Sequence, residues 1–247
     1  MQESLDSLIK LAADKIDSAV RPVSFSGAGL SAESGIATFR DSSDDDALWS
    51  RFDPQQLASQ EGFRAAPETV IDWYNWRRKI LSGAQPNNAH RSLASLKHWW
   101  HITQNVDHLL ELAGADTKRV LHLHGSLLED HCNSSCGYSE KIDLSGAPPL
   151  RRCVCGDYMR PSVVWFGEAL PQFILQTAME EAGRADLMLV VGTSAQVYPA
   201  AGLVDIAVGN GADVIIVNTE CSGVSGAHVV ELVGPAGELL PRIIRCA

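Results

Sequence analysis

The stretch Phe25–Arg40, FSGAGLSAESGIATFR, places two closely spaced glycines directly after a predicted short strand, RPVSFS at residues 21–26. Gly27, Gly29 and Ala32 follow the spacing G-x-G-x-x-G/A, which joins the first strand and helix of dinucleotide-binding sheets. The first glycine permits a tight turn, and the second lets a pyrophosphate approach the backbone. An ordinary strand-to-helix turn is the alternative. No lysine follows as in a nucleoside-triphosphate loop, so the stretch favours a dinucleotide turn in an α/β sheet.

The remainder of the chain alternates between apolar segments and helical patterns. Strands are predicted at 99–105, 119–125, 185–194, 213–218 and 228–234, and helices at 1–20, 67–81, 87–98, 106–114, 198–212 and 235–247. Apolar runs without alternation, separated by helices, are typical of a parallel sheet covered on both faces. We therefore predict an α/β fold with a Rossmann-like, doubly wound parallel sheet and a smaller second domain. The sheet domain is assigned residues 1–40, 90–128 and 160–247, and the smaller domain the insertions 41–89 and 129–159.

The composition is that of a globular chain with an acidic balance. The 247 residues are 45% hydrophobic and carry 30 acidic and 20 basic side chains, a net charge of −10. The densest basic run, WRRK at 76–79, is too short for phosphate neutralisation, so we expect no nucleic-acid partner. No run approaches the roughly 18 apolar residues of a membrane span, and acidic residues interrupt the first helix, unlike a signal peptide. We expect a cytoplasmic chain without membrane partners, with a monomer as the working hypothesis.

Polar side chains come at the end of the predicted strand 99–105. Gln104, Asn105 and Asp107 would lie at the carboxyl edge of the sheet, where ligands of open α/β sheets bind. Their amides and carboxylate can hydrogen-bond sugar hydroxyls or an amide. The simple dehydrogenase pattern is incomplete, because its ribose-binding acid has no candidate after a strand: Asp44–Asp46 fall in a loop.

Two histidines end the next predicted strand. In LHLHG, residues 121–125, His122 and His124 share one face, and His124 comes last, directly before a glycine. An imidazole with an ordinary pKa near 6.5 suits general-base chemistry at neutral pH. His124 is therefore the candidate base, with a hydrogen-bonded structural role as its alternative, and His122 is interpreted as structural.

Four of the six cysteines form a paired pattern. Cys132-x-x-x-Cys136 and Cys153-x-Cys155 have the dimensions of a zinc ribbon, although both spacings depart from the commoner C-x-x-C. Four thiolates close a tetrahedral site, which indicates structural zinc. His131 is an alternative ligand, and the two remaining cysteines, Cys221 and Cys246, are interpreted as incidental.

Together these segments resemble the sirtuin family, the NAD-dependent protein lysine deacylases, including bacterial sirtuins and the members that remove succinyl and malonyl groups. The resemblance runs in the family's order from about residue 20 to 241 through GAGLSAESGIATFR, TQNVDHLLELAG, HLHG, the four cysteines, RPSVVWFGEALP, GTSAQVYPAAGL, VNTE and GPAGELLP. It implies NAD and an acyl-lysine peptide bound between a Rossmann-type domain and a small helical and zinc-binding domain. The residues implied to contact NAD are Gly27, Ala28, Gly29, Ile36, Phe39, Arg40, Gln104, Asn105, Asp107, Gly192, Thr193, Ser194, Asn218, Thr219, Glu220 and Ala236.

The resemblance also implies a reaction. The acyl oxygen of the modified lysine attacks the ribose carbon bearing nicotinamide, nicotinamide leaves, and His124 takes a proton from a ribose hydroxyl that attacks the acyl carbon. Asn105 is the second implied catalytic residue. Water completes the transfer to free lysine and O-acyl-ADP-ribose. The segment Val164–Glu168 is implied to pair with the peptide as an added strand through Val164, Phe166, Gly167 and Glu168.

The segment DWYNWRRKIL, residues 72–81, contains the residues that indicate which acyl group is removed. Tyr74 and Arg77 are three residues apart and share a helix face, and a phenol with a guanidinium can hold a carboxylate. The pair resembles the Tyr-x-x-Arg element of sirtuins that remove succinyl and malonyl groups, and Ala58 falls where such members keep a small residue. Two surface residues on a charged helix are the alternative.

Ala37 stands where the family usually has proline and Asp41 where it often has glycine, and residues 42–46 are unusually acidic. Acidic side chains near a phosphate site are expected to hold NAD less firmly, and the cysteine spacing is expected to affect the ligand geometry more than the presence of zinc. Three alternatives remain: a sirtuin-like mono-ADP-ribosyltransferase or NAD hydrolase, a module that senses NAD without turnover, and an ordinary dehydrogenase. Asn105 and His124 disfavour the first, the complete set of polar residues disfavours the second, and the cysteines and the missing ribose acid disfavour the third.

Overall fold

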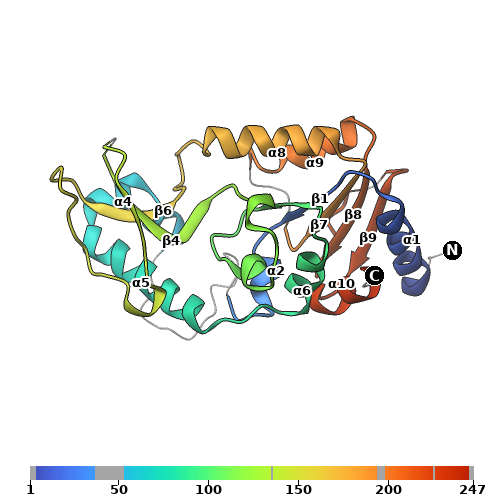
Figure 1. Ribbon diagram of the computed structural model, residues 1–247, viewed down its shortest axis with the longest axis horizontal. Coiled ribbons are helices and arrows are strands. Elements are labelled where there is room, and N and C mark those ends of the chain that lie inside the picture. Colours follow the sequence, from blue (N-terminus) through green and yellow to red (C-terminus); the bar gives the residue numbers. More distant parts are fainter. Residues whose placement is uncertain (1–3, 37–52, 135, 194–197, 225, 245–247) are drawn as a thin grey trace.

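The computed structural model describes residues 4–36, 53–134, 136–193, 198–224 and 226–244 (Figure 1). The helices are α1 (Leu5–Ser18), α2 (Gly29–Ala32), α3 (Pro54–Leu57), α4 (Gln60–Ala65), α5 (Pro67–Gly83), α6 (Asn88–Ser95), α7 (Leu109–Leu112), α8 (Gln172–Arg184), α9 (Gly202–Gly209) and α10 (Ala236–Ile243), with 3₁₀ turns at Thr117–Arg119 and Leu144–Gly146. The strands are β1 (Pro22–Ser26), β2 (Trp100–Thr103), β3 (Val120–His122), β4 (Gly125–Cys132), β5 (Ser139–Lys141), β6 (Met159–Val163), β7 (Leu187–Val191), β8 (Asp213–Asn218) and β9 (Val229–Val233).

The main sheet has six parallel strands in the order β3-β2-β1-β7-β8-β9. From β1 the chain first builds outward through β2 and β3, then crosses to β7 and builds outward on the other side through β8 and β9. This reversal confirms the predicted doubly wound sheet. It creates a switch point between β1 and β7, where open α/β sheets bind ligands beyond the strand ends.

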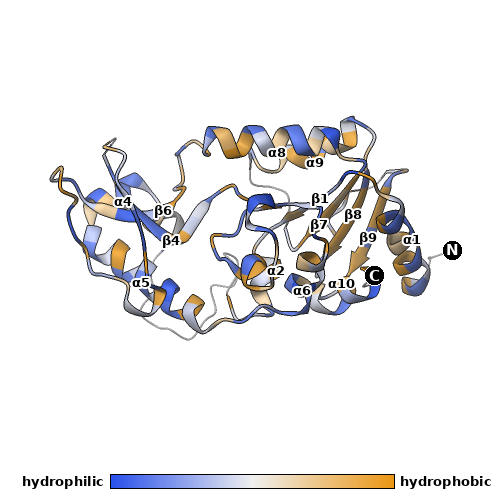
Figure 2. Cartoon of the chain, in the orientation of Figure 1, coloured by the Kyte–Doolittle hydropathy of each residue, from blue (hydrophilic) through white to orange (hydrophobic). Residues whose placement is uncertain are grey.

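Helices cover both faces of the main sheet. Apolar side chains of β7, β8 and β9 alternate between two buried clusters, one against α1, α6 and α10 and the other against α8 and α9. Figure 2 shows the hydrophobic strands β8 and β9 lying between these helices. Burial on both faces explains why β7 and β8, in the middle of the sheet, are continuous apolar runs without a polar side.

A second, antiparallel sheet has the order β5-β4-β6 and lies beside α4 and α5 at the opposite end from α1 (Figure 1). A third apolar cluster, around Phe63, Tyr74 and Trp165, joins it to these helices. The buried guanidinium of Arg78 on α5 donates to Asp130 of β4 at 2.6 Å and to the Leu127 carbonyl at 2.9 Å. Apolar packing and a buried ion pair thus hold the helical segment to the small sheet.

The structure differs from the predicted elements in several places. The predicted helices 106–114 and 198–212 shorten to α7 and α9, and α8 and the three strands of the small sheet had no counterpart in the prediction. The small sheet begins at Gly125 and ends at Val163, whereas the predicted insertion covers 129–159. The domain boundaries therefore stay a prediction. Among the described residues, no helix is both long and apolar enough to cross a bilayer.

Candidate active site

The turn after β1 is pressed against the turn after β7. Gly27 donates its N–H to the Val191 carbonyl at 3.0 Å, and Gly29 donates to the Gly192 carbonyl at 2.9 Å. A Cβ on Gly29 would lie 2.7 Å from the Gly192 Cα, and one on Gly192, which has φ +58°, would collide with the Leu30 nitrogen. Only glycines allow this approach, which forms the backbone floor of the switch point.

Half-buried amides line the switch point on both sides. Gln104, which follows β2, donates from Nε2 to the Thr193 hydroxyl at 3.3 Å. Asn218, at the end of β8, donates from Nδ2 to the Thr193 carbonyl at 3.4 Å. A Cβ on Gly27 would lie 2.8 Å from the Thr193 Cβ, so Thr193 links the glycine turn to both amides. Four chain segments therefore converge at this edge of the sheet.

The other residues predicted to contact NAD occupy several settings. Ala28 is half-buried in the turn, and Ile36 packs partly buried against the third apolar cluster. Thr219 and Glu220 follow β8 and are exposed, whereas Ala236 is buried at the first position of α10. Three predicted residues lie outside the part of the chain that the structure describes: Phe39, Arg40 and Ser194.

A buried hydrogen-bond network orients Asn105. Its Nδ2 donates to the Ser31 hydroxyl at 3.0 Å, and Ser31 donates in turn to the Asp107 carboxylate at 2.8 Å. His90 Nε2 lies 3.3 Å from the same hydroxyl, and burial lowers the pKa of His90 to about 4, so this imidazole is neutral at pH 7. Ser31 and His90 were not among the residues predicted from sequence, although Ser31 lies within the glycine-rich stretch. Asn105 and Asp107 are thus brought together by Ser31.

His124 is half-buried where the chain leaves the main sheet. Its Nδ1 lies 3.0 Å from the Gln104 carbonyl, which can only accept, so Nδ1 carries the hydrogen and Nε2 carries the lone pair that can accept. Burial lowers the pKa of His124, and the bond to Gln104 opposes that effect. Gly125 follows with φ +78° and starts the small sheet. His124 therefore sits between the two sheets with one basic nitrogen unused by Gln104.

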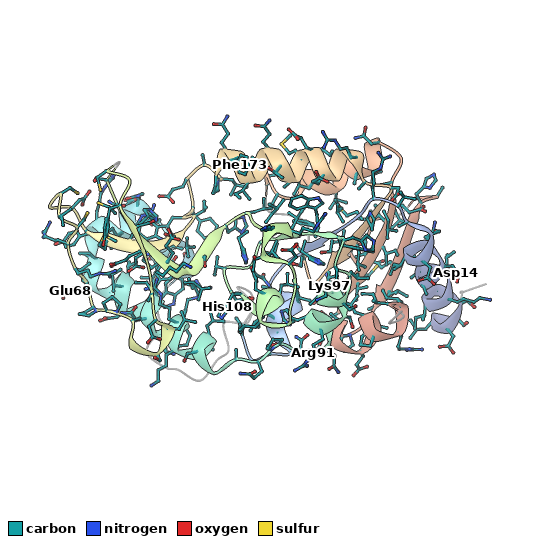
Figure 3. All side chains as sticks on the ribbon, viewed as in Figure 1. Asp14, Glu68, Arg91, Lys97, His108 and Phe173 are labelled. Atoms are coloured by element: carbon teal, nitrogen blue, oxygen red, sulfur yellow. The ribbon has the colours of Figure 1, made fainter. Side chains whose placement is uncertain are left out.

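His122 has a different environment from His124. Its Nδ1 lies 2.9 Å from the Asn105 carbonyl and its Nε2 lies 2.7 Å from Glu111. Burial lowers the pKa of His122, but the hydrogen bond and charge of Glu111 outweigh it, so the pKa is raised. His108, near the centre of Figure 3, has a buried Nδ1 with no hydrogen-bond partner among the described residues. The paired His122 fits the predicted structural role.

Tyr74 and Arg77 lie together on α5. The Arg77 guanidinium is 5.6 Å from the Tyr74 ring centroid and 5.0 Å from that of Trp73. Burial lowers the pKa of Arg77 and raises the pKa of Tyr74, so the phenol is protonated at neutral pH. Ala58, 4% exposed, belongs to the same apolar cluster as Tyr74. The structure thus brings the three predicted acyl-selectivity residues into one region.

The segment Val164–Glu168 links this region to His124. Val164 donates its N–H to the His124 carbonyl, and Phe166 donates to the Ala58 carbonyl, both at 2.9 Å. Phe166 and Gly167 are exposed, while Glu168 is half-buried. Two backbone N–H groups of the segment are therefore already hydrogen-bonded, one to the residue predicted as the base and one to a residue of the predicted acyl pocket.

The four predicted zinc ligands form one cluster. The sulfur atoms of Cys132, Cys136, Cys153 and Cys155 all lie within 4.8 Å of one another, with a Cys132–Cys155 separation of 3.4 Å and a Cys136–Cys153 separation of 3.7 Å. A tetrahedral zinc with bonds of about 2.3 Å needs sulfur separations of about 3.8 Å, so the cluster fits. His131 lies outside this cluster, with Nδ1 3.1 Å from the Ser162 hydroxyl. The four-thiolate prediction is supported over the histidine alternative.

Comparisons with known proteins agree with this geometry. A family model described as the Sir2 family matches residues 27–199. An NAD-dependent protein deacylase of Mycobacterium tuberculosis (strain ATCC 25177 / H37Ra) is 44% identical over 236 residues, covering 91% of this chain and 97% of the relative. NAD-dependent protein deacylase 1 of Pseudomonas aeruginosa is 46% identical over 241 residues, covering 92% and 94%.

Solved structures of Sir2 proteins are also similar to this chain. A crystal structure of a Sir2 homologue in complex with NAD has a TM-score of 0.84 at 42% identity, covering 97% of this chain and 92% of its own. A Sir2 protein bound to a myristoylated histone peptide has a TM-score of 0.76 at 35% identity, covering 97% and 95%. Both likenesses extend over almost the entire length of the chain.

Proposed function

This chain belongs to the Sir2 family of NAD-dependent protein deacylases, and we propose that it removes succinyl and malonyl groups from protein lysines at least as well as acetyl groups. The observation that carries the acyl preference is the contact of the half-buried Arg77 with the protonated Tyr74, whose buried cluster also contains the small Ala58. A guanidinium stays charged at neutral pH and donates in the plane of a carboxylate. A succinyl or malonyl chain ends in such a carboxylate, whereas an acetyl group does not.

The glycine floor and its amides fit NAD. Gly27, Gly29 and Gly192 let two backbone turns meet, and Gln104, Asn105 and Asn218 offer half-buried polar groups around them. We propose that these residues hold NAD, which supplies the activated sugar carbon that accepts the acyl oxygen. The Nδ1–H of His124 is held by Gln104, so its Nε2 can take the proton from a sugar hydroxyl. Asn105 is held by Ser31 for a polar contact in the same site.

The four cysteines fit zinc, which would hold the β4–β5 hairpin and take no part in the chemistry. We further propose the domain division 1–40, 90–128 and 160–247 against 41–89 and 129–159. The segment Val164–Glu168 is proposed to bind the peptide backbone through the groups not used by His124 and Ala58. Monomeric state and cytoplasmic location remain predictions.

The acyl proposal is tested with one peptide sequence carrying acetyl-, malonyl-, succinyl- or long-chain-acyl-lysine, each with NAD. The variant Arg77→Met should lower kcat/KM for the succinyl peptide about 10-fold or more, since a hydrogen bond to a charged group contributes about 1.5–3 kcal/mol. It should spare the acetyl peptide. Arg91→Met, which removes a guanidinium on the separate helix α6, is the matched control.

Equal losses on acetyl and succinyl peptides in Arg77→Met would contradict the acidic-acyl preference, as would a native enzyme that removes only acetyl groups. Product analysis by mass spectrometry separates the alternative activities. Deacylation yields O-acyl-ADP-ribose, an ADP-ribosyltransferase leaves ADP-ribose on the protein, and an NAD hydrolase releases free ADP-ribose without consuming acyl peptide.

A further inference from the structure

The Tyr74 hydroxyl is held by a residue far away in the sequence. Trp165, 91 positions along the chain, donates its indole Nε1–H to the Tyr74 oxygen at 2.8 Å. Both side chains are fully buried, and their rings lie 6.5 Å apart at an angle of 25°. The indole nitrogen can only donate, so Tyr74 is the acceptor in this bond.

Trp165 is itself fixed from several directions. Its backbone N–H donates to the Glu168 carboxylate at 2.9 Å, and its ring contacts that of Phe63 at a centroid distance of 5.2 Å. The Arg160 guanidinium lies 3.8 Å from the indole centroid and pairs with Glu168 at 2.6 Å. Gln60 of α4 donates to the same carboxylate at 2.9 Å. The indole therefore has little freedom to move away from Tyr74.

This arrangement determines what Tyr74 can donate. A phenol has one hydrogen and can also accept, so an N–H that occupies an acceptor position turns the hydroxyl hydrogen away from itself. Burial keeps the hydroxyl protonated by raising the pKa of Tyr74. The hydrogen is thereby available to an acceptor other than Trp165, on a ring whose centroid lies 5.6 Å from the Arg77 guanidinium.

We propose that Trp165 is a specificity-determining positioning residue, whose indole N–H sets the Tyr74 hydroxyl to donate its hydrogen to the terminal carboxylate of an acidic acyl chain. The inference rests on the acyl preference proposed above. In that arrangement Tyr74 and Arg77 contact the acyl carboxylate, and Trp165 acts only through Tyr74. An acetyl group has no terminal carboxylate, so the effect of Trp165 should depend on the acyl group.

The test measures KM and kcat for succinyl-lysine and acetyl-lysine versions of one peptide in the native enzyme, Trp165→Phe, Tyr74→Phe and the double variant. Trp165→Phe keeps an aromatic ring and removes the N–H. Its KM for the succinyl peptide should rise about 2- to 10-fold relative to the acetyl peptide, the range for one hydrogen bond. In the Tyr74→Phe background the same change should leave the succinyl-to-acetyl ratio as it was. Trp99→Phe, which alters a buried tryptophan in another cluster, is the matched control.

An equal loss on both peptides, or the same selectivity loss with and without the Tyr74 hydroxyl, overturns the proposal. If Trp165→Phe does not fold, 3-benzothienylalanine at position 165 replaces the N–H by sulfur at nearly constant shape, with the same expected shift in ratio. The native enzyme tests the underlying function separately. A native enzyme without desuccinylase activity overturns the acyl preference, whereas a succinyl-active enzyme whose ratio ignores Trp165 overturns this inference alone.

Discussion

At the scale of single residues, the placement of one hydrogen decides the role of His124. A carbonyl cannot donate, so the contact of Gln104 with Nδ1 leaves Nε2 as the basic nitrogen. His122, two residues earlier, has both nitrogens in contact with acceptors, the Asn105 carbonyl and the Glu111 carboxylate. The two histidines therefore differ in protonation: His124 is neutral and able to accept a proton, whereas His122 favours the cation.

The pH dependence of deacylation should report His124. Burial lowers its pKa below the ordinary 6.5, so the base form persists on the acidic side of neutrality. The rate constant kcat/KM should therefore be flat near pH 7 and fall only as pH drops through a value below 6.5. Initial-rate assays from pH 5 to 8, with folding monitored by circular dichroism, measure this fall of kcat/KM at acidic pH, the acidic limb of the pH profile.

His124→Ala is the companion measurement. Losing a positioned general base costs about 10²–10⁴ in rate, so the variant should keep its fold while deacylation falls by at least that range. The acidic limb should disappear from its residual activity. Near-normal turnover in the variant, or an acidic limb centred above 6.5 in the native enzyme, would remove His124 from this role.

Sequence reasoning identified the residues of this site that lie beside glycines or at strand ends. Gln104 and His124 lie at the ends of predicted strands, and the carboxyl edge of a parallel sheet brings such positions together. Ser31 and Trp165 were missed because their roles depend on side-chain contacts across 76 and 91 positions, to Asp107 and Tyr74. Periodicity along the chain carries no information about such contacts.

At the scale of elements, the cysteine cluster lies in the part of the small sheet that has few buried apolar residues. The central strand β4 pairs with β5 at three positions only, and both β5 and the residues around it are largely exposed. Around the cysteines the buried apolar cluster consists of Cys132, Cys153 and Met159, whereas the larger cluster of this end lies between the sheet and helices α4 and α5. A metal bond is therefore expected to supply stability that packing alone does not give.

Removing zinc should destabilise this end of the molecule. Cys153→Ser should reduce the zinc content from about one ion per chain and lower Tm, because the remaining thiolates no longer close a tetrahedron. Cys221→Ser is the control, since Cys221 is exposed and its sulfur lies 3.0 Å from Glu231, outside the cluster. Zinc is measured by atomic absorption and Tm by calorimetry. Full zinc content in Cys153→Ser, or equal zinc loss in the control, would contradict the assignment.

The elements that sequence patterns predicted are those with two buried faces or a wide apolar stripe. The strands β7 and β8 of the main sheet are continuous apolar runs, and α1 buries Ile9 and Ile16 at helical spacing. The helix α8 buries only Ala178 and Ala182 and has no side-chain cap at its start, so its stripe is narrow. The strand β4 has an irregular burial pattern and a register shift, which removes the alternation expected of a half-buried strand.

At the scale of the whole molecule, the candidate site depends on how the two sheets meet. The chain passes from β3 into β4 through His124 and Gly125, and Val164, just after β6, donates back to the His124 carbonyl. Leu127 of β4 donates to the Val106 carbonyl, in the loop after β2, at 2.9 Å. The base is thus placed by the junction between the two sheets.

Gly125→Ala should disturb that junction more than an equivalent change elsewhere. Gly125 has φ +78°, and a Cβ there would collide with the Ser162 carbonyl of β6. Gly211, with φ +83° and nothing within 4 Å of an added Cβ, is the matched control that carries conformational strain alone. That strain costs about 1–2 kcal/mol, so Gly211→Ala should lower Tm by a few degrees and keep its activity per folded molecule.

Gly125→Ala should lower Tm further and reduce deacylation, because β6 must move and His124 moves with it. Calorimetry and kcat/KM at a temperature where both variants are folded decide this. Equal Tm losses with unchanged turnover in both would show that the junction does not position the base.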